Sequence, residues 1–444
     1  MVDAVDSKST VERRAGSSPA SGTTKKYAPH LRGVFCFRKG PITLSSADSI
    51  KGANMMLDIE KIRTDTLGVS HGVHLLASGA ALMPQPVVDA VIEHTQLEAR
   101  VGGYEAAADQ AVPLAHVYDS VAQLIGAKRH EIALVPNATV AWCHAFYALP
   151  LEKGARILTC EAEYGANYVA FLQRAKRDGL TIDVVPSDAF GAVDLDALES
   201  MIDTRVGLIA MTWVPTNGGL VNPAAKIGEI AQKHGIPYLL DACQAVGQMP
   251  VDVAALGCDF LSATGRKFLR GPRGTGFLYV AEKWLETLEP VVIDHFSASW
   301  VATNQYELRG DARRFETWEN SYALRAGLGI AADYANKLGM KQIEARVCAL
   351  ATYCRENLAH IKGAEIRDIG AQKCGIVSFT IDGLAPEATV ADLQAQGIII
   401  GASTPSSTLL DAQRRKLPTI LRMAPHYYNT RAEIDRCIEV LSTL

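Results

Sequence analysis

The stretch from Tyr238 to Val280 limits what this chain can fold into more than any other part of it. It holds two short apolar runs, and each is followed by a polar turn. Asp241 ends the first run, which begins after Gly235 and Pro237, and Lys267 follows the second run in a Ser-Ala-Thr-Gly-Arg-Lys turn. Short apolar runs bounded by turn residues predict buried strands. We therefore expect both side chains at strand ends in an α/β protein, where loops supply functional sites.

An aspartate and a lysine in this setting suit the cofactor pyridoxal 5'-phosphate. The Lys267 amine would attach the cofactor covalently, and the Asp241 carboxylate would keep its pyridine nitrogen protonated so that the ring accepts electrons. Ser262, Thr264 and Arg266 offer hydroxyls, backbone N–H groups and a guanidinium to the phosphate. The alternative is a surface lysine after a buried strand, with Asp241 as a helix N-cap.

Three motifs carry a resemblance to a known family. The segments DACQAVG, LGCDFLSATGRK and GPRGTGFLYV resemble the class V aminotransferase family of fold-type I pyridoxal-phosphate enzymes, from about Leu75 to the C-terminus. The family includes cysteine desulfurases, C–S lyases and isopenicillin N epimerase-like proteins. The SATGRKFLRGPRGTGFL pattern is most similar to its ergothioneine-pathway members, the hercynylcysteine sulfoxide lyases. The resemblance implies a large domain with a mostly parallel sheet and a smaller α+β C-terminal domain.

Length and composition fit this expectation. A chain of 444 residues exceeds one compact core, so we expect a pyridoxal-phosphate-binding domain over 61–320 and a small domain over 321–444. Residues 1–60 are rich in Ser, Thr, Gly and charge near their start and lack apolar periodicity, which predicts a disordered extension.

Charge and cysteine usage exclude several other classes of protein. The formal net charge is −4, which gives no reason to expect a nucleic acid or an anionic membrane as partner. No apolar run approaches the ~18 residues that a membrane-spanning helix needs. The nine cysteines show no metal-like spacing, so we predict no metal site, and free thiols favour a cytoplasmic location.

The phosphate of the cofactor has a second predicted contact. Asn137, Ala138 and Thr139 follow a strand-like run and open a helix. Free N–H groups and the helix dipole attract phosphate there, so Ala138 and Thr139 are candidate cofactor-binding residues. The alternative is a plain N-cap with an unused glycosylation sequon.

The cofactor ring has three further candidate contacts. Tyr164 lies where desulfurases of the family carry a histidine that stacks on the ring, and a phenol stacks well but shuttles protons poorly near neutral pH. Thr216 and Asn217 occupy a turn that the family places near the ring hydroxyl, although Asn-Gly-Gly is also a strong turn signal. Gln244 follows Asp241 by three residues and could reach the ring oxygen, or could be a buried glutamine bonded to backbone.

Arg422 is the candidate substrate-binding residue. It matches the family arginine that holds the substrate carboxylate, and a guanidinium pairs with a carboxylate through two hydrogen bonds. Desulfurases carry a nucleophilic cysteine shortly before this arginine, whereas residues 397–422 of this chain contain none. The desulfurase mechanism therefore lacks its sulfur acceptor here.

These residues predict a lyase that cleaves a C–S bond of a cysteine-derived amino acid or its sulfoxide by β-elimination. An epimerase or racemase similar to isopenicillin N epimerase, or an aminotransferase, is the alternative within the same cofactor class. A scaffold protein that keeps the fold is the alternative outside enzymes, and the complete set of Lys267, Asp241 and Arg422 opposes it.

The resemblance also implies a homodimer with a shared site. Desulfurases carry FEAGT where this chain has Phe315, Glu316, Thr317, Trp318 and Glu319. In those enzymes the final threonine binds the phosphate of the partner subunit. Glu319 occupies that position here, so we expect either Thr317 or Asn320 to take over or the contact to differ.

Overall fold

The computed structural model describes residues 57–444. The extension predicted for residues 1–60 therefore lies almost wholly outside the described residues, and the first helix, α1, spans Ile59–Thr64. Within residues 57–444, none of the helices combines the length and the apolar character that a membrane crossing requires.

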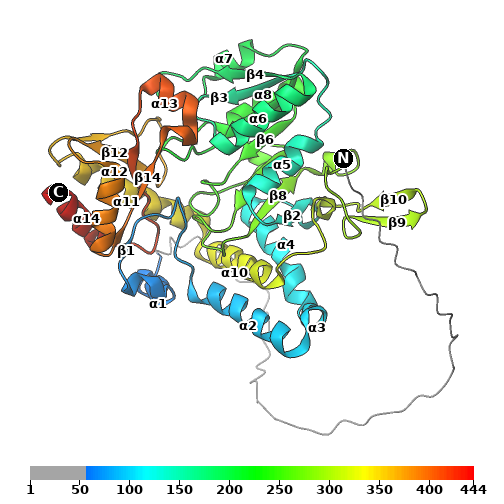
Figure 1. Ribbon diagram of the computed structural model, residues 1–444, viewed down its shortest axis with the longest axis horizontal. Coiled ribbons are helices and arrows are strands. Elements are labelled where there is room, and N and C mark those ends of the chain that lie inside the picture. Colours follow the sequence, from blue (N-terminus) through cyan, green and yellow to red (C-terminus); the bar gives the residue numbers. More distant parts are fainter. Residues whose placement is uncertain (1–56) are drawn as a thin grey trace, which may run out of the picture. The chain divides into compact units, whose positions relative to one another are not determined.

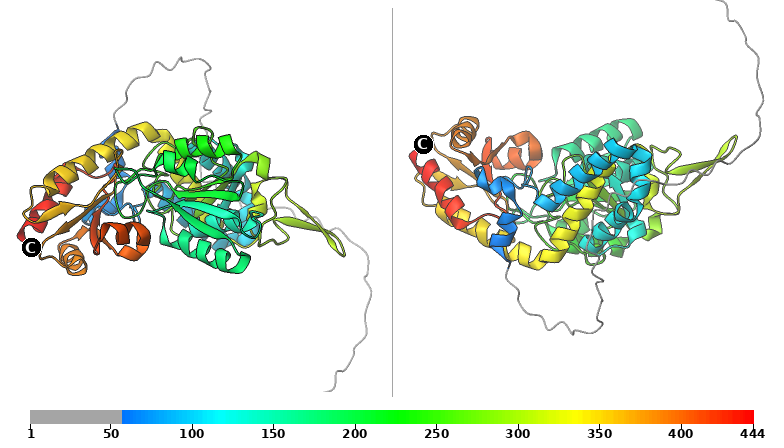
Figure 2. Two further views of the ribbon diagram at one scale, coloured as in Figure 1. Left: turned by 90° about the horizontal axis from the view of Figure 1, so that it is seen from above. Right: turned by 90° about the horizontal axis from the view of Figure 1, so that it is seen from below.

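A seven-stranded sheet forms the centre of the fold, with helices on both of its faces (Figures 1 and 2). β8 runs antiparallel to both of its neighbours, and the remaining adjacent pairs are parallel. The predicted α/β class with a mostly parallel sheet is confirmed. From edge to edge the strands are β2 (Ile132–Val135), β8 (Gly276–Val280), β7 (Phe260–Thr264), β6 (Tyr238–Asp241), β5 (Val206–Thr212), β3 (Arg156–Cys160) and β4 (Thr181–Val185).

Side-chain alternation along the strands divides the core into two layers. Leu239 packs with Phe260 in the layer beneath α5 and α6, whereas Leu240 packs with Leu261 in the layer on the opposite face. Because residues two apart on a strand point to the same face, Asp241 lies on the side of Leu239. The helices around the sheet are α5 (Ala138–Ala148), α6 (Gly165–Asp178), α7 (Leu195–Ser200), α8 (Ala224–His234) and α9 (Val253–Leu256).

Helix α10 (Tyr322–Leu338) packs against two helices from the start of the chain, α2 (Gln85–Val101) and α4 (Ala111–Ile125). Two glycines allow this close approach. A Cβ atom on Gly327 would lie 2.7 Å from Val91, and one on Gly329 would lie 2.8 Å from Val117. The short helix α3 (Gly103–Asp109) joins α2 to α4, and α11 (Met340–Leu358) follows α10.

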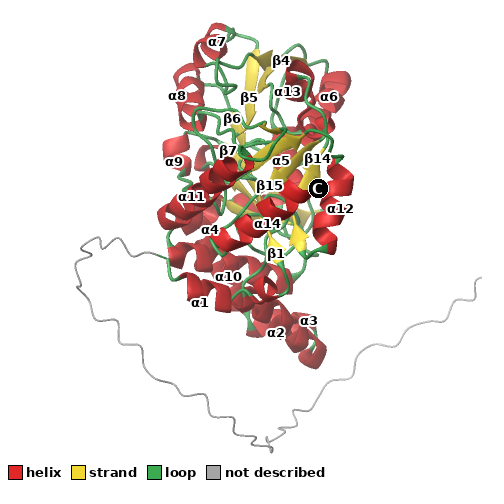
Figure 3. Cartoon of the chain, turned by 90° about the vertical axis from the view of Figure 1, so that its left-hand side faces the viewer, coloured by secondary structure: helices red, strands yellow, loops and turns green. Residues whose placement is uncertain are grey.

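A smaller antiparallel sheet holds the C-terminal part of the chain (Figure 3). Its order is β11 (Ala364–Ile366), β12 (Val377–Ile381), β15 (Ile420–Met423) and β14 (Gly401–Ser403). Its helices are α12 (Pro386–Ala395), α13 (Leu409–Arg415) and α14 (Arg431–Thr443). The early strand β1 (Val73–His74) pairs in parallel with β13 (Ile398–Ile399), so both ends of the described chain meet here. The division into residues 61–320 and 321–444 remains a prediction.

A hairpin of β9 (Ala298–Ala302) and β10 (Gln305–Leu308) projects from the body of the fold (Figure 2). Trp300 lies in the middle of β9, and its exposed fraction is 79%.

Candidate active site

Asp241 lies at the carboxyl end of β6, as predicted, and its carboxylate is buried. Its Oδ2 accepts a hydrogen bond of 2.9 Å from Nδ2 of Asn167, and its Oδ1 accepts one of 2.9 Å from the backbone N–H of Cys243. Ser262 is its neighbour in register on β7. The strand order thus brings the predicted acid beside the strand that leads to Lys267.

The turn that carries Lys267 is held by its own backbone. The N–H of Arg270 donates to the carbonyl of Lys267 at 2.9 Å, and that of Gly271 donates to Gly265 at 2.7 Å. Arg270 has a φ of 63°, which is uncommon for a residue other than glycine. Its buried guanidinium compensates by donating to the carbonyl of Leu82. The turn is therefore anchored to the start of the chain.

The Lys267 amine has no hydrogen bond or ion pair with any of residues 57–444. Burial lowers its pKa, and the nearby cations Arg266 and Arg422 act in the same direction, while Cys243 and Asp241 oppose them. A lysine with a lowered pKa supplies the neutral amine that covalent attachment to a carbonyl requires. This is the environment that the predicted role of Lys267 needs.

Gln244 and Thr216 meet beside this lysine turn. Nε2 of Gln244 donates to the carbonyl of Ser78 at 3.1 Å and to the hydroxyl of Thr216 at 3.3 Å. Asn217 lies one residue further on and points elsewhere. Its Nδ2 donates to the hydroxyl of Thr408 at 3.0 Å, which ties it to the C-terminal part of the chain. Of the two turn residues considered from sequence, the structure brings Thr216 into the cluster and leaves Asn217 outside it.

Arg422 reaches the same cluster from β15. Its Nη1 donates to the carbonyl and to the hydroxyl of Thr216, both at 2.7 Å. Burial lowers its pKa to about 10, and the neighbouring Arg266 contributes to this shift. No carboxylate among residues 57–444 forms an ion pair with it. A half-buried guanidinium without an anionic partner among these residues is a site prepared for one.

The predicted phosphate contacts lie around the other end of the lysine turn. Ala138 and Thr139 open α5, and a Cβ atom on Gly276 would lie 2.8 Å from the backbone of Asn137. Gly276 pairs with Thr264, the last residue of β7 before the turn. The N-terminus of α5 therefore borders the strand end that precedes Lys267. The other two predicted phosphate contacts do not lie on α5. Ser262 is fully buried on β7, and Arg266 donates to the carbonyl of Gly79.

Tyr164 caps the start of α6 and is 37% exposed. Burial raises the pKa of its phenol, and Asp241 and Cys243 add to this effect, whereas Arg266 and Arg422 oppose it. The ring thus lies among the same charged groups as Lys267 and remains a neutral phenol near pH 7. This placement allows stacking and disfavours proton transfer.

Several buried polar atoms around the cluster have no hydrogen-bond partner among the described residues. Such atoms are uncommon in folded proteins unless a ligand or water completes them. Their grouping between the lysine turn and β15 fits a ligand that accepts and donates hydrogen bonds at several points. The residues present therefore fit pyridoxal 5'-phosphate together with an amino acid. The buried atoms without a partner are Ser78 Oγ, Gln244 Oε1, Ser262 Oγ and Arg422 Nε.

Three residues at the site had no predicted role. Asn167 and Glu163 form a buried network under Asp241, and Cys243 places a thiol beside Lys267. Glu163 and Asn167 flank Tyr164, which the resemblance had already singled out, so a carboxylate just before α6 and an amide on its first turn were an available signal. Cys243 gave no comparable signal.

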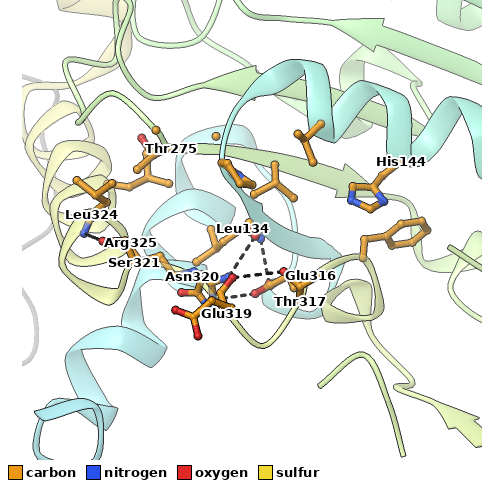
Figure 4. A pocket seen from close by; sticks show the side chains of 17 residues that line it. Leu134, His144, Thr275, Glu316, Thr317, Glu319, Asn320, Ser321, Leu324 and Arg325 are labelled. Atoms are coloured by element: carbon orange, nitrogen blue, oxygen red, sulfur yellow. Dashed lines mark hydrogen bonds and ion pairs between the residues drawn. The ribbon is translucent and has the colours of Figure 1, made fainter. Parts of the chain in front are cut away.

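A cavity of about 330 Å³ lies between β2, α5 and the start of α10 (Figure 4), and Lys267 is not among the residues that line it. Glu316 is buried at its edge, where it accepts a hydrogen bond of 3.0 Å from the N–H of Leu134 and pairs with Arg325 at 2.8 Å. Thr317 and Asn320, the candidates for a contact across a dimer, line this cavity. Within one chain they are therefore not part of the Lys267 cluster.

The chain is similar to proteins of one known family over most of its length. The model of the family described as aminotransferase class-V matches residues 73–437. A probable cysteine desulfurase of Methanothermobacter thermautotrophicus is 29% identical over 392 residues, which cover 87% of this chain and 98% of the relative. One from Xylella fastidiosa is 33% identical over 327 residues, 72% of this chain and 78% of the relative. The apo structure of a cysteine desulfurase from Thermococcus onnurineus superposes with a TM-score of 0.82 at 26% identity, covering 88% of this chain and 99% of that one.

Proposed function

Because the chain belongs to the class-V aminotransferase family, whose members are pyridoxal-phosphate enzymes, we propose that it is a lyase that cleaves a C–S bond of a cysteine-derived amino acid by β-elimination. The substrate class extends to S-substituted cysteines and their sulfoxides, as in the hercynylcysteine sulfoxide lyases that the 262–278 pattern resembles.

The unpaired guanidinium of Arg422 is the observation that carries the proposal. It is a half-buried cation, fixed on one side by Thr216, and its buried Nε has no partner among residues 57–444. An amino acid supplies the missing carboxylate. A substrate bound there lies in the same charged cluster as Lys267. The site therefore suits an α-amino acid better than an amine without a carboxylate.

Each residue then has one role. When bound, pyridoxal 5'-phosphate supplies an electron sink for the bond broken at the α-carbon. Asp241 holds the pyridine nitrogen in its protonated form. Lys267 would anchor the cofactor and, as a free amine, would accept the α-proton at Nζ. Arg422 orients the substrate through its carboxylate. The β-sulfur leaves with the electrons of the C–S bond, and water then converts the remaining fragment to pyruvate and ammonia.

The segment between β14 and β15 favours elimination over transfer of sulfur to the enzyme. It contains the hydroxyl-rich 3-10 helix η5 (Pro405–Thr408), and Asn217 fixes it by bonding Ser403 and Thr408. No cysteine lies between residues 397 and 422. Cys243 is near Lys267, but burial raises the pKa of its thiol well above the usual range, and Asp241 adds to that shift. A protonated thiol is a poor nucleophile.

A cysteine desulfurase is the second candidate, because the relatives at 29% and 33% identity carry that name. The products separate the two functions. The holoenzyme should release pyruvate from S-substituted cysteines or their sulfoxides, whereas a desulfurase converts free cysteine to alanine and leaves a persulfide on a cysteine. Alanine formation with a trapped persulfide would replace the lyase by a desulfurase. Exchange of the α-proton in heavy water without pyruvate would point to an epimerase, and a released keto acid with loss of the cofactor's aldehyde to an aminotransferase.

Two further properties belong to this proposal. The enzyme acts as a homodimer in which the 315–320 segment approaches the site of the partner subunit, which is supported by the buried Oδ1 of Asn320 that lacks a partner among the described residues. Its location is cytoplasmic, which is supported by free thiols at the eight described cysteines. Light scattering at working concentration and localisation of the tagged protein test these two points.

A further inference from the structure

A buried hydrogen-bond network supports the Asp241 carboxylate. The groups that bond to Asp241 in this network take no part in the proposed reaction. Its centre is Glu163, in the short connection between β3 and α6, with an exposed fraction of 3%. The network joins four elements of the fold: the end of β3, the first turn of α6, the end of β5 and the end of β6. A buried carboxylate at such a junction requires partners, because an unpaired one is strongly destabilising.

Glu163 is saturated with donors. Its Oε2 accepts from the hydroxyl of Thr159 at 2.9 Å and from the N–H of Thr212 at 3.1 Å. Its Oε1 accepts from the N–H of Tyr164 at 2.8 Å, from Nδ2 of Asn167 at 2.9 Å and from the hydroxyl of Thr212. Two carboxylate oxygens have about four lone-pair sites, so donors fill every acceptor position of the ionised group. Glu163 therefore acts as a fixed anchor for these donors.

Asn167 connects this anchor to the candidate site. Its Nδ2 donates to Oε1 of Glu163 and to Oδ2 of Asp241, both at 2.9 Å. An amide nitrogen carries two hydrogens, so each carboxylate takes one. A reversed amide would present its oxygen to two carboxylates. Glu163 thus fixes the orientation in which Asn167 serves Asp241.

Asp241 keeps free capacity in this arrangement. Each of its oxygens receives one hydrogen bond from the protein, from Asn167 and from the N–H of Cys243. One acceptor site on each oxygen remains for a ligand. The same network holds the backbone of Tyr164, whose N–H also donates to the hydroxyl of Thr212 at 3.2 Å. The carboxylate and the aromatic ring are therefore positioned by one structure.

We propose that Asn167 and Glu163 are positioning residues, which aim the Asp241 carboxylate at the pyridine nitrogen of the cofactor and so keep that nitrogen protonated. This inference rests on the proposed function, in which Asp241 holds the ring. Neither residue touches the substrate. Burial raises the pKa of Glu163 to about 7, and the second carboxylate, Asp241, contributes to that shift, as expected for two acids that share one amide.

The test uses Asn167→Leu, which keeps the approximate size of the side chain and removes both donors. Asn222→Leu is the matched control. Asn222 is also buried, and its Nδ2 donates to the carbonyl of Thr212 at 2.8 Å, but it makes no contact with Asp241. Both variants lose buried hydrogen bonds, so both should melt earlier than the wild type. A purely structural role for Asn167 predicts no other difference between them.

The deciding readout is the state of the ring nitrogen in the holoenzyme. The protein is loaded with pyridoxal 5'-phosphate labelled with ¹⁵N in the ring, and the nitrogen chemical shift is recorded. We expect Asn167→Leu to move the signal toward neutral pyridine and to slow α-proton exchange of bound alanine in heavy water by about tenfold or more. Asn222→Leu should keep the wild-type shift and exchange rate. If Asn167→Leu retains both wild-type values, the proposal is wrong.

Two further variants make the experiment decisive even if Asn167→Leu does not fold. If Asn167→Leu yields no folded protein, Glu163→Leu replaces it, because removal of both carboxylate oxygens takes away every acceptor that holds Asn167 from behind. Wild-type values in that variant also overturn the proposal. Asp241→Asn must itself shift the signal; if it does not, Asp241 does not hold the ring and the inference falls. Alanine exchange requires no C–S bond, so failure of the lyase assay leaves this test intact.

Discussion

Asp241 and Arg422 are both charged groups of the candidate site, one buried and one half-buried, yet their hydrogen-bond partners differ. Asp241 ends a strand of the large sheet, and both of its oxygens have partners within the chain. Arg422 lies on a strand of the small sheet, donates only to Thr216, and has no carboxylate partner among residues 57–444. The Asp241 carboxylate is held by hydrogen bonds from the protein, whereas the Arg422 guanidinium has no anionic partner in the part of the chain that the structure describes.

This difference matches how long each ligand stays bound, because Asp241 is proposed to hold the cofactor and Arg422 the substrate. A cofactor stays through every turnover, so the group that holds it gains from a fixed, preorganised setting. A substrate carboxylate enters and leaves, and a buried cation that lacks an anion favours its return. The comparison predicts that changes near Asp241 alter the cofactor, whereas changes near Arg422 alter the substrate.

The largest effect is expected at Lys267, which lies between the two charges. Lys267→Ala removes the amine that anchors the cofactor and accepts the α-proton, so turnover should fall by at least ~10³-fold. Borohydride reduction followed by mass spectrometry should find the cofactor on Lys267 in the wild type and on no residue in the variant. Lys283→Ala is the control, because Lys283 follows β8 and pairs with Asp259 at 2.5 Å. Cofactor attached to another lysine would refute the assignment.

Arg422→Lys is expected to have the next largest effect and to spare the cofactor. It keeps the charge but loses the planar fork that binds and orients a carboxylate, so kcat/KM should fall by roughly 10²-fold. The visible absorbance of the holoenzyme should stay at the wild-type value. Arg355→Lys is the matched control in the small sheet region, because Arg355 is already paired with the buried Asp368 at 2.7 Å. Loss of the cofactor band in Arg422→Lys would contradict the comparison.

The sequence predicted the parts of the site that depend on strand ends. Asp241 and Lys267 follow apolar runs that became β6 and β7, and neighbouring parallel strands place their carboxyl ends at one edge. The class of the fold followed from the same alternation of strands and helices. Arg422 came from the family resemblance, since nothing in its local pattern distinguishes it from a surface arginine.

The remaining parts depend on tertiary contacts that local patterns do not encode. Thr216 and Asn217 are adjacent in one turn, and only the backbone path decides that Thr216 faces Gln244 while Asn217 faces Thr408. Asn167 meets Asp241 because α6 covers one particular face of the sheet. A single sequence contains the residue types of such a network but not the distances between them.

Glu163, which supports Asp241 through Asn167, should make the stability of the protein depend on pH. Burial raises the pKa of Glu163 from 4.5 to about 7. Between these values the folded protein holds a proton that the unfolded chain has lost, so the free energy of unfolding falls as the pH rises through this range. Glu163→Gln lacks this dependence. Its melting temperature relative to the wild type should therefore rise by a few degrees between pH 5 and pH 8, equivalent to about 3 kcal/mol at most.

Calorimetry on both proteins after removal of the cofactor measures this difference. Glu163→Gln loses acceptors in the network, so a lower melting temperature than the wild type at every pH agrees with the prediction. The prediction concerns only how the difference in melting temperature changes with pH. A difference in melting temperature that stays flat or falls as the pH rises would show that Glu163 is ionised throughout the range.

The smallest expected effect tests the open side of the comparison at Thr216. Thr216→Val removes the hydroxyl that receives Nη1 of Arg422 at 2.7 Å, but the bond to the backbone carbonyl of the same residue remains. Loss of one hydrogen bond to a charged group that keeps a second costs about 1 kcal/mol, so KM should rise roughly fivefold. The rise should be the same for every accepted amino acid, because all share the carboxylate. Thr216→Ser should restore the wild-type KM.

Asn217→Leu supplies the contrast within the same turn. Asn217 fixes the 403–408 segment and makes no contact with Arg422, so its loss should change the preference among S-substituted cysteines and leave the binding of the common carboxylate alone. Steady-state kinetics on three substrates that differ only beyond the sulfur separate a uniform change from a selective one. A selective change in Thr216→Val, or a uniform one in Asn217→Leu, would mean that carboxylate and side chain are recognised by the turn as a whole.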